Sequence, residues 1–166
     1  MTKRLAMGML CGAVLLTGAA CGDDTADDEG AGASNAGRPC VPVGSELERS
    51  ATETIAVELR DFEFVLARNE ISAGVVTFEV ENAGSEDHEL AFIPGGGDVP
   101  MTPEGTPDED ALEAAGAFEL EAFGPGTTCA ATYQLDPGTY TLFCIVESPD
   151  GMTHHRKGMV ATLTVV

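Results

Sequence analysis

Hydrophobic and polar residues alternate along most of the chain from Cys40 to Val166. Three segments show this alternation clearly: residues 55–59, 76–80 and 88–92. A period of two is typical of a strand that buries one face. Asn82-Ala83-Gly84 is a turn signal between the second and third of these segments. The pattern therefore predicts three β-strands in the first half of this region.

Two more strands and a final one are predicted after residue 126. Residues 127–135 and 139–146 flank Asp136-Pro137-Gly138, in which proline presets φ and glycine tolerates a positive φ. We therefore expect these two segments to form a hairpin. Residues 159–166 are predicted to form the last strand.

One short helix is predicted between the strands. Thr106-Pro107-Asp108-Glu109 has the spacing of a capping box with proline at the first helical position, and Gly116 is a stop signal. We expect a helix over residues 107–115, preceded by a Gly- and Pro-rich loop at 94–105. Many short strands with one helical excursion predict an all-β fold, a Greek-key β-sandwich.

The composition narrows the function classes. The 166 residues include 8 Lys and Arg against 28 Asp and Glu, for a formal net charge of −20. Nucleic-acid phosphates are bound by clustered basic residues, so a nucleic-acid partner is excluded. The chain length suits one domain, which we place at residues 40–166.

The N-terminal segment, residues 1–20, has the pattern of an export signal. Lys3 and Arg4 precede an apolar run that is too short to span a bilayer permanently, and small residues lead into Cys21. This junction resembles the processing site of bacterial lipoproteins, although Gly18 stands where that class usually has a Leu-like residue. The resemblance implies a lipidated Cys21. The alternative is ordinary cleavage near Ala20, which leaves Cys21 as a free thiol.

Residues 21–39 are predicted to form a flexible acidic tether. From residue 22 to 39 no apolar residue is larger than Ala, so ordering this segment would bury too little surface to offset the entropy cost. A linker of this length has an end-to-end distance of about 24 Å. The tether would hold the domain close to a membrane surface.

The residues that could carry chemistry are histidine, cysteine and methionine. His88 lies on a predicted strand, and Cys144, His154, His155 and Met159 follow within a single segment. Two histidines, one cysteine and a weakly bound axial methionine are the ligands of a blue copper site. Taken singly, each residue could instead be an ordinary core residue, and Cys144 could be half of a disulfide.

These residues and their order resemble the cupredoxin family, which includes plastocyanin and azurin. The matching pieces are residues 76–80 with Asn82-Ala83-Gly84 and His88, then Pro137-Gly138-Thr139-Tyr140 leading to Cys144, then residues 154–159. The resemblance covers about half of the chain, residues 54–93 and 127–166. It implies one type 1 copper ion bound by His88, Cys144, one of His154 and His155, and Met159 as the axial ligand.

The loop between Cys144 and the second histidine is longer than in well-known cupredoxins. Nine residues separate Cys144 from His154, so the chain must fold back at Pro149-Asp150-Gly151. The spacing is similar to that of a branch of secreted cupredoxin-like proteins with a long ligand loop. That similarity favours His154 over His155.

Cysteine counting leaves two pairings open. Beyond Cys21 the exported chain keeps Cys40, Cys129 and Cys144, an odd number. Pairing Cys40 with Cys129 leaves Cys144 free for copper, and we favour it. Pairing Cys129 with Cys144 across the predicted hairpin would remove the thiolate.

We therefore expect a lipid-anchored blue copper protein that carries single electrons between redox partner proteins of the envelope. It would lie in the periplasm or on the outer face of a membrane, as a monomer held to the membrane only by its lipid. No nucleophile elbow, P-loop or dinucleotide fingerprint is present, so we expect no enzyme activity. The alternatives are a module for copper handling and a metal-free cupredoxin-like interaction domain.

Overall fold

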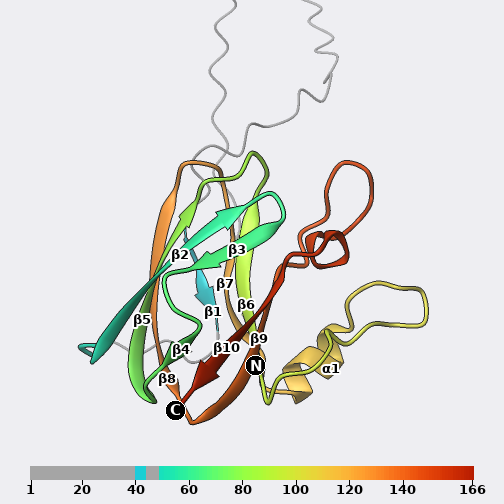
Figure 1. Ribbon diagram of the computed structural model, residues 1–166. Coiled ribbons are helices and arrows are strands. Elements are labelled where there is room, and N and C mark those ends of the chain that lie inside the picture. The colour runs from blue at the N-terminus through green and yellow to red at the C-terminus, as the bar shows by residue number, and fades with distance from the viewer. Residues whose placement is uncertain (1–39, 44–48) are drawn as a thin grey trace, which may run out of the picture. The chain divides into compact units, whose positions relative to one another are not determined.

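Two β-sheets form the part of the chain that the computed structural model describes, residues 40–43 and 49–166 (Figure 1). The six-stranded sheet has the order β1 (Pro42–Val43), β7 (Phe118–Phe123), β6 (His88–Pro94), β9 (Gly138–Phe143), β10 (Val160–Val165) and β4 (Glu70–Ile71). The four-stranded sheet has the order β3 (Glu63–Leu66), β2 (Glu53–Arg60), β5 (Gly74–Asn82) and β8 (Thr128–Leu135). The predicted strands at 55–59, 76–80 and 88–92 are confirmed as parts of β2, β5 and β6.

The hydrophobic positions of the two sheets face each other and form the core. On β5 the buried residues alternate with less buried ones, as the sequence pattern predicts. The largest fully buried side chains of this core come from both sheets: Phe78 and Tyr133 from one, Phe92 and Phe123 from the other. Phe143 belongs to a second, smaller cluster with Ala91, Ile93, Val99 and Leu112. The predicted all-β sandwich is thereby confirmed.

The predicted hairpin of residues 127–135 and 139–146 is wrong. Strand β8 pairs with β5 in one sheet, whereas β9 pairs with β6 and β10 in the other. The Asp136-Pro137-Gly138 turn therefore carries the chain from one sheet to the opposite sheet, as in a Greek key. A turn sequence specifies the local reversal of the chain but not which strand becomes the hydrogen-bonded neighbour.

The predicted helix is present but shorter. Helix α1 spans Glu109–Ala114, and the side chain of Asp108, rather than that of Thr106, caps it by accepting a hydrogen bond from the Ala111 amide at 3.0 Å. The Thr106 hydroxyl instead bonds the Thr102 hydroxyl at 2.9 Å, and Pro107 forms a bridge with Met101. With these contacts residues 106–107 stay outside the helix, which begins two residues later than predicted.

Several elements of the structure were not predicted from the sequence. Strands β1, β3, β4 and β7 and the 3-10 helix η1 (His154–Lys157) were not predicted, and β7 lies directly beside β6. The predicted signal segment, the tether and Cys21 lie outside the described residues. Within residues 40–43 and 49–166, the helices are too short and too polar to cross a membrane.

Candidate metal centre

Three potential metal ligands meet at one edge of the six-stranded sheet. His88 is the first residue of β6, Cys144 directly follows β9, and His154 begins η1. Strands β6 and β9 are antiparallel neighbours, so the start of one and the end of the other lie at the same edge. All three side chains are fully buried.

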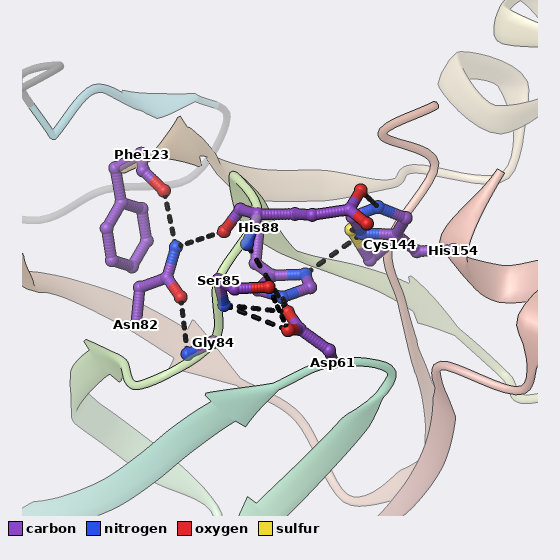
Figure 2. Close-up of polar contacts among 9 residues, drawn as sticks. Asp61, Asn82, Gly84, Ser85, His88, Phe123, Cys144 and His154 are labelled. Atoms are coloured by element: carbon purple, nitrogen blue, oxygen red, sulfur yellow. Dashed lines mark hydrogen bonds and ion pairs between the residues drawn. The ribbon is translucent and has the colours of Figure 1, made fainter. Parts of the chain in front are cut away.

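The ligand atoms of these residues lie close together (Figure 2). His88 Nδ1 is 2.9 Å from His154 Nδ1, and Cys144 Sγ is 3.3 Å from His154 Nδ1. One ligand atom from each residue lies within 4.8 Å of the other two. Two imidazole nitrogens and one sulfur thus point into the same small volume.

The long loop after Cys144 folds back on itself, as its length required. The amide of Gly151 donates to the Ser148 carbonyl at 2.9 Å, and Glu147 forms a bridge with Thr153. The amide of His155 donates to the carbonyl of Cys144 at 2.7 Å. These backbone bonds return the chain and fix His154 next to the cysteine.

His154, and not His155, faces His88 and Cys144. His155 is half-buried, and its Nδ1 bonds the Thr153 hydroxyl at 3.0 Å. Met159 is fully buried, and its amide donates to the His154 carbonyl at 3.0 Å. Its backbone is thus tied to His154, and the axial role of its side chain stays a prediction.

Cys40 and Cys129 form a disulfide, and in the described part of the chain Cys144 is the cysteine that remains free. The alternative pairing of Cys129 with Cys144 does not occur, because Cys129 is bonded to Cys40 and because β8 and β9 are not the paired hairpin strands that this alternative assumed. The thiol needed for a metal site is therefore preserved.

Asp61, in the turn between β2 and β3, holds the outer edge of His88. Its Oδ1 lies 2.7 Å from His88 Nε2, and the Ser85 amide donates to Oδ2 at 2.9 Å. Although burial opposes it, hydrogen bonds from the Ser85 hydroxyl, from His88 and from the amides of Ser85 and Glu86 lower the pKa of Asp61 to about 2. Asp61 is therefore ionised at neutral pH and accepts a hydrogen bond from His88.

Glu86 makes the corresponding contact with His154. Its Oε2 lies 3.1 Å from His154 Nε2. The ring of Phe62 packs edge-on against the His154 imidazole with 4.8 Å between ring centroids, and Lys157 Nζ lies 4.5 Å from the centre of the Phe62 ring. Burial lowers the pKa of His154, and the hydrogen bond to Glu86 offsets this only in part. The imidazole is therefore neutral at neutral pH.

Asn82 organises the loop that carries Glu86. Its side-chain Nδ2 donates to the carbonyls of Phe123 at 2.7 Å and Glu86 at 3.0 Å, and its Oδ1 accepts from the Gly84 amide at 3.0 Å (Figure 2). The turn predicted from Asn82-Ala83-Gly84 is thus held by a buried side chain. We refer to residues 83–87 as the β5–β6 loop.

The surroundings of Cys144 favour its protonated form when no metal is bound. Burial raises the pKa of the thiol well above its usual value, and the nearby charge of Glu89 adds to this, while amide hydrogen bonds from Glu89 and Val146 oppose it. Burial also raises the pKa of Glu89 to about 8, against the effect of the Ile145 amide that donates to it. A metal ion bound here would have to displace the thiol proton, so we expect binding to strengthen as the pH rises.

Sequence reasoning missed Asp61 and Glu86. Glu86 lies two residues before His88, where the run Ser85-Glu86-Asp87 could have drawn attention. Asp61 is 27 residues from His88, and nothing in its local sequence marks it. Only the packing of the β2–β3 turn against the β5–β6 loop reveals its role.

The donor set suits copper. A soft sulfur together with two neutral imidazoles binds both Cu(I) and Cu(II), and a thioether such as that of Met159 can complete a type 1 site. His88, Cys144 and His154 would be the equatorial ligands. Zn²⁺ also accepts sulfur and nitrogen donors.

Comparison with known proteins identifies the fold. No protein-family model matches the chain, and no curated protein matches its sequence. Among solved structures, auracyanin B aligns with a TM-score of 0.56 at 23% identity, over 75% of this chain and 97% of that one. Auracyanin of Roseiflexus castenholzii aligns with a TM-score of 0.46 at 22% identity, over 70% of this chain and 99% of that one. Auracyanin A of Chloroflexus aurantiacus aligns with a TM-score of 0.42 at 18% identity, over 68% of this chain and 99% of that one. With two packed sheets in a Greek-key arrangement and this alignment to auracyanin B, the described part of the chain has the cupredoxin fold.

Proposed function

We propose that this protein is a type 1 copper protein that carries single electrons. The observation that carries the proposal is the buried convergence of His88, His154 and Cys144, whose ligand atoms lie within 4.8 Å of one another. Bound copper would supply a one-electron couple between Cu(II) and Cu(I). The protein would hold the ligands in a rigid arrangement, so that little reorganisation accompanies electron transfer.

We also propose that the protein works outside the cytoplasm, anchored through lipid on Cys21, and exchanges electrons with proteins of the envelope. The Cys40–Cys129 disulfide supports export, because such bonds persist in oxidising compartments. Replacing Cys21 with Ser should abolish labelling by radioactive fatty acid and release the protein from membranes. Labelling that survives this substitution would contradict the anchor.

The copper site is tested on the full chain, produced in an oxidising compartment and loaded with Cu(II). We expect an intense thiolate-to-copper absorption band in the visible region, a reversible one-electron wave in voltammetry, and loss of the band in the Cys144→Ser variant. The matched control is His155→Ala, which removes a neighbouring imidazole outside the ligand group and should keep the band.

Three results would contradict the proposal. Binding of Zn²⁺ in preference to copper would point to a structural metal site. Tight but colourless binding of Cu(I) alone would favour copper handling over electron transfer. An unreactive Cys144 with no metal bound would leave a cupredoxin-like domain without a redox function.

A further inference from the structure

We infer that Asp61 and Glu86 are positioning residues that hold His88 and His154 as Nε2–H tautomers, with both Nδ1 lone pairs directed at the bound metal. The inference rests on the proposed function and concerns the same site. It assigns roles to two carboxylates that lie on loops of the sandwich and outside the ligand set.

The hydrogen-bond chemistry leaves one tautomer for each ring. Each Nε2 faces a carboxylate oxygen, at 2.7 Å for His88 and at 3.1 Å for His154. In each pair the carboxylate oxygen is the acceptor and the ring nitrogen is the donor, so the geometry places the proton on Nε2. A ring that donates through Nε2 leaves Nδ1 as the nitrogen whose lone pair can bind a metal. The two Nδ1 atoms are the ones that converge, 2.9 Å apart.

One loop ties both carboxylates to the site. In the β5–β6 loop, the amide and hydroxyl of Ser85 donate hydrogen bonds to Asp61 (Figure 2). The same loop carries Glu86, whose side chain contacts His154. It thereby connects the β2–β3 turn on one side with η1 on the other. For His154, which sits at the end of a long ligand loop, this is a side-chain anchor in addition to the backbone bonds.

The two carboxylates also affect the relative affinity of the site for Cu(II) and Cu(I), and therefore its reduction potential. A carboxylate hydrogen-bonded to a ligating histidine raises the basicity of the ring, which stabilises the more highly charged metal ion. Both imidazoles are fully buried, whereas the side chains of Asp61 and Glu86 are 29% and 30% exposed, so each contact is shielded from water on its imidazole side only. Removing either carboxylate should therefore weaken Cu(II) binding more than Cu(I) binding and raise the reduction potential.

The test compares Glu86→Ala with the conservative variant Glu86→Gln, and Asp61→Ala with Asp61→Asn, in the full chain. Long-range ¹H–¹⁵N NMR of the metal-free protein reports which ring nitrogen carries the proton, and competition with a chelator measures Cu(II) and Cu(I) affinities. Glu63→Gln, at an exposed position two residues from Asp61, is the control for loss of one surface charge. Unfolding curves show whether each variant still folds.

We expect the Nε2–H tautomer for both rings in the unmodified protein and mixed tautomers at the affected ring in the alanine variants. Cu(II) affinity should fall about 10–100-fold in the alanine variants. Glu86→Gln should keep the tautomer, because its amide oxygen still accepts from Nε2–H, while the potential rises. A change no larger than in Glu63→Gln, with both tautomers retained in Glu86→Ala, would overturn the inference.

Failure of the proposed function gives a different result. An unmodified protein that binds no copper yet shows the Nε2–H tautomer in both rings, lost on alanine substitution, would contradict the copper function while leaving the positioning roles intact. Copper binding with an intense band that is insensitive to Asp61 and Glu86 would support the function and overturn the positioning roles.

Discussion

Gly84 lies directly against the imidazole of His88. A Cβ atom built on Gly84 would lie less than 3.0 Å from His88 Nε2 and from Asp61 Oδ1. The close approach is fixed from the other side, because the Gly84 amide donates to the buried Asn82 side chain. Glycine is required here for space next to the histidine, and the His88–Asp61 hydrogen bond depends on it.

Substituting Gly84 with Ala should therefore damage the metal centre. The added methyl group must displace either the His88 ring or the Asp61 carboxylate, since both lie within its radius. We expect copper affinity to fall at least about tenfold, within the range seen when such outer partners are lost. Chelator competition measures this, with Ala83→Ser at the exposed neighbouring position as the control. Equal affinities in the two variants would contradict the argument.

Replacing Met159 with Leu should separate ligation from packing. The two side chains have similar volume, so the free energy of unfolding of the metal-free protein should change by less than about 1.5 kcal/mol. If the thioether is the axial ligand, its loss removes electron donation to the metal and the reduction potential of the copper protein rises. Voltammetry checks this. Met152→Leu, on the exposed part of the ligand loop, should leave the potential unchanged; the same potential in both variants would rule out axial ligation by Met159.

The Cys40–Cys129 disulfide should contribute strongly to stability. It joins residues 89 positions apart and so restricts the unfolded chain. The double variant Cys40→Ala/Cys129→Ala should lose about 2–5 kcal/mol of unfolding free energy, measured by chemical denaturation of the metal-free protein. Reducing the unmodified protein should cause a loss of similar size. The control is Cys144→Ala, which keeps the disulfide and should therefore lose as much unfolding free energy on reduction as the unmodified protein does. If reduction destabilised the unmodified protein but not Cys144→Ala, the assigned pairing would be wrong.

Stability should also fall as the pH rises through the titration range of Glu119. Burial raises the pKa of this half-buried carboxyl on β7, and the charges of Glu121 and Glu109 add to the effect. The folded protein therefore holds this proton more tightly than the unfolded chain, so the stabilisation is complete below the ordinary Glu pKa and is lost as the pH rises through the raised one.

The Glu119→Gln variant should show a weaker decline in unfolding free energy with pH than the unmodified protein. Chemical denaturation at a series of pH values from about 4 to 8 measures this difference, over the range in which a raised Glu pKa acts. Glu79→Gln removes the same charge at an exposed position in the other sheet and is the control. Parallel curves for the two variants would contradict the prediction.

Much of the fold follows from local patterns in the sequence. The period-two alternation identifies β2, β5 and β6 because each buries one face, and that signal lies within a few neighbouring residues. The short β3 and β4 carry too few residues for a periodic signal. The Asp136-Pro137-Gly138 turn was also recognisable, but its sequence holds no information about which sheet the next strand enters.

The candidate site divides in the same way. His88, Cys144, His154 and Met159 could be proposed from residue type and order alone, because few residues bind copper and their chain order is distinctive. The choice of His154 over His155 needed the fold of the ligand loop, in which backbone bonds turn one ring inward. The choice of disulfide needed the tertiary structure, which brings Cys40 next to Cys129 although they are 89 positions apart.

By itself, therefore, the sequence determined the fold class, the candidate ligands and the excess of acidic residues. Only the tertiary structure decided which carboxylates hold the ligand rings and why Gly84 is a glycine. The physical reason is the distance along the sequence between the residues involved. Strand patterns and ligand types are local properties, which can be recognised from neighbouring residues. The contacts of Asp61 with His88 and of Glu86 with His154 join residues 27 and 68 positions apart, and they exist only once the loops of the two sheets have packed together.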